Sequence, residues 1–177
     1  MKRLLIFDLN GVLLLRNRIN KDPDFVVGNF YCYKRQGIEE FLDWVHEHYD
    51  VAVWTSAMPH NTLPIVSEIW GDRISKLKFI FTQLECTYDN PKTKSKPLFY
   101  KELSIVWRVF PNYDYTNTLL IDDSQEKVML NPPFTSIHPK TMTMEDRGID
   151  HELWNYLKKL NDSDEDIPDF VGKNYLT

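Results

Sequence analysis

The sequence predicts an α/β domain in which helices flank a parallel sheet. Four short runs are almost wholly apolar, and segments with helical spacing of apolar residues lie between them. A run that is apolar on both faces is typical of a strand buried in a parallel sheet. Strands that alternate with helices indicate that the strands pair in parallel. The expected strands are Leu4–Phe7, Val51–Trp54, Phe79–Phe81 and Thr118–Ile121.

The expected helices follow from apolar residues at intervals of three and four. They are Gly37–His48, Asn61–Trp70, Leu98–Phe110 and a last helix near Asp150–Leu160. A short edge strand is expected at Thr135–Ile137. The polar, lysine-rich residues 83–97 are expected to form a loop.

Residues 12–34 predict a small antiparallel insertion after the first strand. Turn signals occur at Lys21–Asp24 and at Gly28–Asn29, and short apolar or aromatic segments flank the second turn. We therefore expect a β insertion between the first strand and the first helix.

Length and composition indicate one globular domain. The chain has 177 residues, enough for one domain with a substantial core and too few for two ordinary ones. We expect a single domain over residues 1–177, with its motifs within about 3–160 and an acidic, solvated tail that contains Asp162, Asp164, Glu165 and Asp166. With 42% hydrophobic residues, a disordered chain is excluded.

Charge and cysteine content restrict the partners and the location. A net charge of -5 argues against direct binding of nucleic acid, which needs a concentrated basic surface. No stretch is long enough to cross a membrane, so no membrane partner is expected. Cys32 and Cys86 lack metal-ligand spacing and are expected to be free thiols in a reducing compartment. We expect a monomer in the cytoplasm or nucleus.

Polar side chains follow three of the expected strands. Asp8, Thr55 and the pair Asp122–Asp123 each come directly after an apolar run. Ligands of parallel α/β sheets lie at the carboxyl ends of the strands, so these side chains should meet at one edge. Lys101, on the expected third helix, would lie nearby.

This combination predicts phosphoryl transfer with magnesium. Clustered carboxylates repel one another unless a cation lies among them, and oxygen-only ligands such as Asp8 and Asp122 suit Mg²⁺. Lys101 would neutralise the transferred phosphoryl group, while Thr55 and the backbone N–H groups after Asp8 would donate hydrogen bonds to its oxygens. Asp8 can attack phosphorus to form an aspartyl phosphate.

Two-component receiver domains use the same residue types in another order. Their acid pair follows the first strand, and their phosphoacceptor aspartate comes later. Here the single Asp8 comes first and the pair Asp122–Asp123 comes last. The order therefore argues against a receiver domain.

The motifs resemble the haloacid-dehalogenase (HAD) superfamily. More narrowly, they are similar to the NLI-interacting-factor group, which contains phosphatases of the RNA polymerase II C-terminal domain (CTD). The matching segments are Phe7–Leu13, Val53–Ala57, Phe99–Leu103 and Leu120–Ser124, together with Tyr33–Arg35 and Asn131–Pro133. The resemblance implies a HAD-like (Rossmannoid) sheet without a large cap domain, as the short insertion at 12–34 also suggests.

The resemblance implies specific roles at the nucleophile and the metal. Asp8 would be the nucleophile, and Mg²⁺ would be bound by Asp8, the backbone of Asn10, and Asp122. Asp123 would act near the metal.

The resemblance also implies how the substrate is bound. Thr55, Ser56 and Lys101 would bind the phosphoryl group. The implied substrate is a phosphoserine or phosphothreonine protein. A basic rim for such a phosphopeptide could come from Lys92, Lys94 and Lys96.

Asn10 departs from the pattern of these phosphatases. They place a second acid two residues after the nucleophile, where it protonates the leaving oxygen and later activates water. Asn10 has no titratable proton near neutral pH. Since acid/base assistance contributes about 10²- to 10⁴-fold, a slow enzyme or a phosphate trap is expected.

Three interpretations follow. The first is a weak phosphatase in which water or another residue, with His60 as a candidate, replaces the missing acid. The second is a pseudophosphatase that binds a phosphoprotein. The third is an enzyme with a different substrate. Deamidation of Asn10, which precedes Gly11, would also create an acid at this position.

Overall fold

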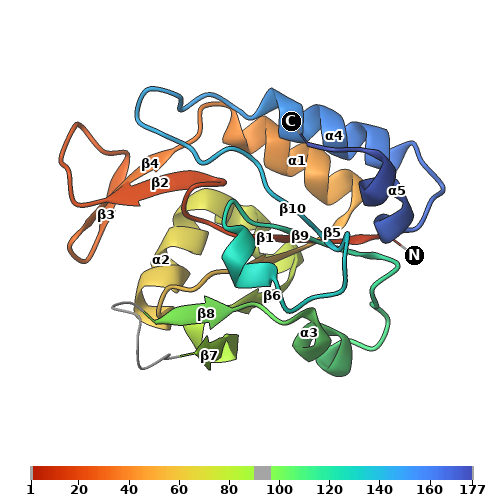
Figure 1. The fold of residues 1–177 in the computed structure, drawn as a ribbon. Coiled ribbons are helices and arrows are strands. Elements are labelled where there is room, and N and C mark those ends of the chain that lie inside the picture. Colours follow the sequence, from red (N-terminus) through yellow and green to blue (C-terminus); the bar gives the residue numbers. More distant parts are fainter. Residues whose placement is uncertain (1, 90–96, 177) are drawn as a thin grey trace.

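A five-stranded parallel sheet forms the centre of the computed structural model, which describes residues 2–89 and 97–176 (Figure 1). The strand order is β10-β9-β1-β5-β6. The strands are β1 Leu4–Phe7, β5 Asp50–Trp54, β6 Leu77–Phe81, β9 Thr118–Ile121 and β10 Ser136–Ile137. All four predicted strands and the predicted edge strand are confirmed, as is the α/β class.

The register of the sheet brings distant carboxylates to the same level. Phe7, the last residue of β1, pairs with Ile121, the last residue of β9. Phe7 also pairs with Val53 of β5 on its other side. The residues that follow β1 and β9 are Asp8 and Asp122, so the pairing sets them side by side at one edge.

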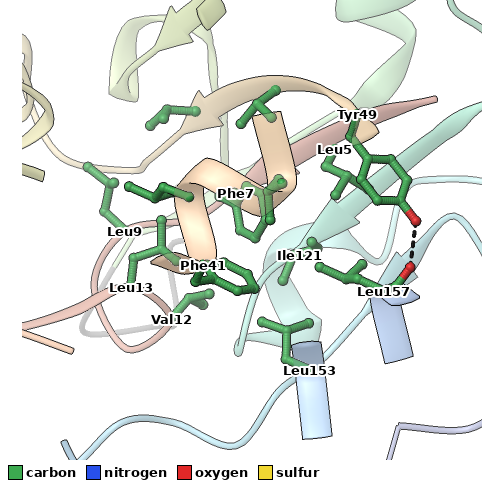
Figure 2. Packing of buried hydrophobic residues seen from close by; sticks show 14 of the residues in the cluster. Leu5, Phe7, Leu9, Val12, Leu13, Phe41, Tyr49, Ile121, Leu153 and Leu157 are labelled. Carbon is green, nitrogen blue, oxygen red and sulfur yellow. Dashed lines mark hydrogen bonds between the residues drawn. The ribbon is translucent and has the colours of Figure 1, made fainter. Parts of the chain in front are cut away.

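Helices cover both faces of the sheet. Leu5 and Phe7 of β1 pack into a cluster with residues of α1 Ile38–His48, α2 Pro59–Trp70 and α4 His151–Asn161 (Figure 2). Leu4 and Ile6 point to the opposite face and pack with α3 Leu103–Val109. Alternate residues of a strand point to opposite faces, which explains why β1 is apolar throughout. No helix in the described residues is long and apolar enough to span a bilayer.

The predicted insertion is a three-stranded antiparallel sheet. Its strands are β2 Leu14–Asn17, β3 Phe25–Val27 and β4 Phe30–Lys34, in the order β2-β4-β3. The hydroxyl of Tyr33 donates to the carbonyl of Ile19 and accepts from the N–H of Lys21, which ties the β2–β3 loop to β4. The insertion projects beyond one end of α2 in Figure 1, to the side of the central sheet.

Two predictions around the third helix were wrong. Residues 83–97 contain the 3₁₀ turn η2 Gln83–Glu85 and the strand β7 Thr87–Asp89, which pairs with β8 Leu98–Tyr100. Helix α3 begins only at Leu103, so Lys101 is not helical. Phe99 fits the helical spacing but packs instead against Tyr88 across the β7–β8 pair, with ring centroids 5.3 Å apart.

The C-terminal segment is more ordered than predicted. Asp162, Asp164 and Asp166 are exposed as expected, but helix α5 Ile167–Lys173 follows and buries Ile167 and Phe170. The guanidinium of Arg3 donates to the carbonyls of Leu160, Ser163 and Glu165 at 2.6–2.7 Å. These contacts fasten the segment to the beginning of β1.

One histidine in the fold should make stability depend on pH. His46 of α1 is half-buried and accepts a hydrogen bond from Trp70 Nε1 at 3.0 Å. Burial, aided by Lys76 and Arg73, lowers the pKa of His46 to about 4. Between that value and the ordinary value of about 6.5, the unfolded chain binds more protons, so stability is present above pH 6.5 and lost toward pH 4. From pH 7.5 to 5, the wild type should lose about 1 kcal/mol more unfolding free energy than His46→Gln in urea titrations.

Candidate active site

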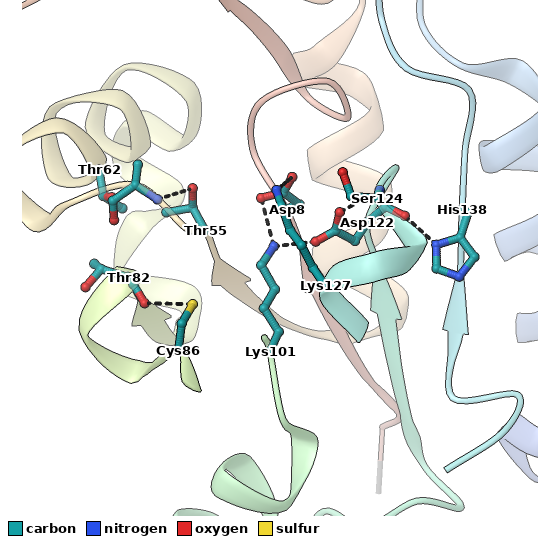
Figure 3. Close-up of polar contacts among 11 residues, drawn as sticks. Asp8, Thr55, Thr62, Thr82, Cys86, Lys101, Asp122, Ser124, Lys127 and His138 are labelled. Atoms are coloured by element: carbon teal, nitrogen blue, oxygen red, sulfur yellow. Dashed lines mark hydrogen bonds and ion pairs between the residues drawn. The ribbon is translucent and has the colours of Figure 1, made fainter. Parts of the chain in front are cut away.

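Two carboxylates and a lysine form a buried cluster at the carboxyl end of the sheet (Figure 3). The ammonium of Lys101 lies 2.9 Å from Asp8 Oδ1 and 2.5 Å from Asp122 Oδ2. Asp122 and Lys101 are 0% exposed and Asp8 is 2% exposed. Lys101 thus lies beside Asp8 and Asp122, in an extended segment rather than in the expected helix.

A third carboxylate completes a group that can hold a cation. One oxygen from each of Asp8, Asp122 and Asp123 lies within 4.8 Å of the others. Asp8 Oδ2 is buried and has no hydrogen-bond partner in residues 2–89 and 97–176. Hard divalent cations prefer carboxylate oxygens, and an unpaired buried carboxylate oxygen is costly. The chemistry of this donor set therefore fits Mg²⁺.

Burial and charge act differently on the members of this cluster. Burial raises the pKa of Asp8, with a further contribution from Asp122, although Lys101 opposes the shift. Burial also opposes ionisation of Asp122, but Lys101 and Lys127 outweigh it and lower the pKa of that carboxyl. Asp8 and Asp122 likewise outweigh burial at Lys101 and raise its pKa to about 12. Lys101 therefore stays protonated. Asp8 is the carboxylate whose ionised form an added cation would stabilise most.

Backbone contacts hold Lys101 in its extended segment. The N–H of Lys101 donates to the carbonyl of Lys127 at 2.7 Å. The side chain of Asn131 donates to the carbonyl of Lys101 and accepts from the N–H of Leu103, both at 2.8 Å. Asn131 thus fixes both the end of the extended segment and the start of α3. The sequence shows a motif that begins at Asn131, but it predicted no structural role for Asn131.

Thr55 and Ser56 lie at the end of the neighbouring strand β5. Thr55 is 4% exposed; its N–H donates to the carbonyl of Phe81, and its hydroxyl accepts from the N–H of Ala57 at 3.2 Å. Neither Thr55 nor Ser56 bonds to Asp8 or Lys101, but Figure 3 shows Thr55 at the same edge of the sheet. Ser56 instead lines a cavity of about 450 Å³ that also borders Lys127.

Neither Asn10 nor His60 forms a hydrogen bond to Asp8. Asn10 is exposed, and its side-chain oxygen accepts a hydrogen bond from the N–H of Arg16 at 2.7 Å. His60 is exposed in the first turn of α2 and forms no hydrogen bond to Asp8 or Asn10. The expected basic residues Lys92, Lys94 and Lys96 lie outside the described residues.

Gly11 allows Asp123 to approach the backbone that follows Asp8. Its φ is +92°, and a Cβ at this position would clash with Asp123 Oδ2. Asp123 Oδ2 also accepts from the hydroxyl of Thr141 at 2.7 Å, which limits its freedom to move away. Thr141 was not identified from the sequence, because no strand or motif marks its loop.

Gly11→Ala should therefore strain the backbone and displace Asp123. We expect a loss of about 1–3 kcal/mol in unfolding free energy, together with weaker Mg²⁺ binding measured by calorimetry. Gly71→Ala is a matched control, because Gly71 also has a positive φ of +53° but nothing within 4 Å of its added Cβ. Gly71→Ala should cost stability and leave Mg²⁺ affinity unchanged. Equal Mg²⁺ affinities in wild type and Gly11→Ala would contradict this account.

Solved structures with the same fold include a CTD phosphatase. The structure of Fcp1, described as an essential RNA polymerase II CTD phosphatase, matches with a TM-score of 0.57 at 15% identity over 80% of this chain and 42% of that chain. A fission yeast Fcp1 variant bound to beryllium fluoride matches with a TM-score of 0.54 at 17% identity over 90% and 50%. At these identities the likeness shows a shared fold and nothing about activity.

Sequence relatives agree with this fold. An uncharacterized FCP1 homology domain-containing protein of Schizosaccharomyces pombe is 28% identical over 142 residues, covering 74% of this chain and 58% of the relative. Ubiquitin-like domain-containing CTD phosphatase 1 of Drosophila melanogaster is 23% identical over 148 residues, covering 80% and 45%. This chain spans about half the length of these relatives. The model of the NLI interacting factor-like phosphatase family matches residues 3–169, which is nearly the whole chain. The chain therefore belongs to the NLI interacting factor-like phosphatase family.

Proposed function

We propose that this chain is a magnesium-dependent phosphoprotein phosphatase that acts slowly through Asp8. The observation that carries the proposal is the buried cluster, in which Lys101 bridges Asp8 and Asp122 and Asp8 Oδ2 has no hydrogen-bond partner among residues 2–89 and 97–176. A carboxylate with one oxygen fixed and the other unpaired is oriented to act as a nucleophile.

Mg²⁺ would be held by Asp8, Asp122, Asp123 and the backbone of Asn10. When bound, it neutralises negative charge between the carboxylates and the phosphate. The proximity of three carboxylates supports this assignment.

The remaining chemical steps are assigned to residues of this chain. The Asp8 carboxylate donates an electron pair to phosphorus while the bond from phosphorus to the substrate oxygen breaks, which gives an aspartyl phosphate and an alkoxide that must gain a proton. Lys101, Thr55 and Ser56 bind the phosphoryl oxygens. Water then attacks phosphorus and releases phosphate, which restores the Asp8 carboxylate.

Asn10 is the reason that turnover should be slow. The alkoxide must take its proton from water, and the attacking water has no carboxylate base, because Asn10 can supply neither function. The hydrogen bond from Arg16 N–H to Asn10 Oδ1 supports a structural use of this side chain.

The proposed substrate is a phosphoserine or phosphothreonine protein. Relatives are named CTD phosphatases, and the insertion between β1 and α1 is a small sheet rather than a large cap, which supports a peptide substrate. We propose action as a monomer in the cytoplasm or nucleus, without nucleic acid or membrane binding. The acidic net charge of -5 supports the exclusion of nucleic acid.

A pseudophosphatase that binds phosphoproteins is the second candidate. Asn10 favours it, because an amide removes the acid/base while it keeps a hydrogen-bond donor and lowers charge repulsion near the phosphate. The two candidates share the phosphate site and differ in whether phosphate is released.

A single assay separates them. Phosphate release from an aryl phosphate with Mg²⁺ is measured for wild type and Asp8→Asn, alongside retention of a phosphoserine peptide. The phosphatase proposal expects slow release that Asp8→Asn abolishes. Peptide retention without any release would favour the pseudophosphatase, and release that persists in Asp8→Asn would remove Asp8 as the nucleophile.

A further inference from the structure

We infer that Lys127 is a second phosphoryl-binding cation, placed at the solvent side of the site. This inference rests on the proposed function, because it assigns a new residue to the same phosphate site. Lys127 belongs to the 3₁₀ turn η3 Gln125–Val128, which follows the Asp122–Asp123 pair.

Lys101 is poorly placed to meet an incoming phosphate first. Its side chain is 0% exposed, and its ammonium already donates to Asp8 Oδ1 and Asp122 Oδ2. An ammonium has three donors, so only one remains for a ligand. A phosphate ester that enters from solvent therefore needs another cation nearer the surface.

Lys127 has the required position. Its ammonium lies 4.0 Å from Asp8 Oδ2, the oxygen that has no hydrogen-bond partner in the described residues. Its side chain is 23% exposed, and it lines the cavity of about 450 Å³ that Ser56 also borders. Lys127 thus lies beside Asp8, as Figure 3 shows, and also borders the cavity.

The backbone fixes Lys127 relative to the rest of the site. Its N–H donates to the carbonyl of Ser124 at 3.2 Å, and its carbonyl accepts from the N–H of Lys101 at 2.7 Å. Ser124 N–H in turn donates to Asp122 Oδ1 at 2.8 Å. The two lysines and Asp122 are therefore parts of one hydrogen-bonded unit, unlike a lysine on a free surface.

The balance of positive and negative charges in the site also favours a second lysine. Three carboxylates are balanced by Lys101 and one divalent cation, and a phosphate ester adds about 1.5 to 2 negative charges. With Lys101 and the cation already matched to the carboxylates, Lys127 supplies the positive charge that offsets part of the phosphate. Its ammonium would bind phosphoryl oxygens as a partly desolvated, charge-assisted donor.

Titration of inorganic phosphate into the Mg²⁺-loaded protein tests the inference. Calorimetry is performed on wild type, Lys127→Met, Lys127→Arg and Lys76→Met. Lys127→Met should raise the Kd for phosphate roughly ten-fold, and Lys127→Arg should restore most of the affinity. Lys76→Met is the matched control, because Lys76 is exposed at the amino end of β6, at the opposite edge of the sheet. It should leave the Kd unchanged.

The outcomes distinguish this inference from the proposed function. If wild type binds no phosphate, the proposed phosphate site itself fails. If wild type binds phosphate and Lys127→Met binds it equally well, only the role of Lys127 is overturned. Mg²⁺ affinity is measured in the same variants, and Lys127→Met should bind Mg²⁺ at least as tightly as wild type. Weaker Mg²⁺ binding that accounts for the lost phosphate affinity would also overturn the inference.

Discussion

Asn10→Asp should raise the rate of phosphate release from an aryl phosphate by roughly 10²- to 10⁴-fold. The change restores a titratable carboxyl two residues after Asp8, where it can protonate the leaving oxygen and later activate water. The side-chain oxygen that accepts from Arg16 N–H is kept, since Asp and Asn have the same shape. The rate is measured with saturating Mg²⁺ at several pH values, and a new pH dependence should appear with the new acid.

Two controls test whether the gain in rate comes from the new acid acting with Asp8. The double variant Asp8→Asn/Asn10→Asp should return to background, because the added acid has no nucleophile to assist. Intact-mass and peptide analysis of the wild type should show Asn10 unchanged, which excludes activity from deamidated protein. A normal Mg²⁺ affinity combined with no gain in Asn10→Asp would mean that the missing acid does not limit turnover.

Lys101→Met should have the largest effect on stability, a loss of about 3–5 kcal/mol in unfolding free energy. The substitution leaves Asp8 and Asp122 buried together without their shared cation. The loss is measured by urea unfolding in EDTA, and Mg²⁺ should recover part of it by binding between the carboxylates. Lys76→Met, the same change at an exposed position, should alter stability by no more than about 0.5 kcal/mol.

A second substitution separates charge from packing. In Lys101→Met/Asp122→Asn one of the two unpaired negative charges is removed, so the double variant should be more stable than Lys101→Met alone. If the double variant is less stable than the single variant by the full cost of Asp122→Asn, the two side chains act independently and the ion-pair account is wrong.

The sequence was informative where apolar periodicity sets the structure. Runs that are buried on both faces identified β1, β5, β6 and β9, and strand ends identified Asp8, Thr55 and Asp122. These predictions depend on short-range patterns that survive folding. The fold class was reached in this way, whereas the family came from the resemblance of the motifs to a known group.

Other features depend on contacts that the sequence does not display. Lys101 follows Phe99, whose spacing suits a helix, yet pairing of β8 with β7 holds this segment extended. Asn131, Thr141 and Lys127 lie in loops or a short turn, where side-chain position follows from three-dimensional packing. Helix α5 was not predicted, because it is only 7 residues long and directly follows an acidic stretch.

The hydrogen bonds between Arg3 and the C-terminal segment have a consequence for folding during synthesis. Arg3 lies 157 residues before Leu160, and Asp8 lies 93 residues before Lys101. The strand that carries Asp8 is therefore translated well before its neighbour β9 and before the C-terminal segment that Arg3 contacts. A nascent chain must keep β1, with its apolar faces, from aggregating until β9 and the C-terminal segment have been translated. Co-translational folding should make this chain dependent on chaperones during synthesis, whatever the stability of the finished domain.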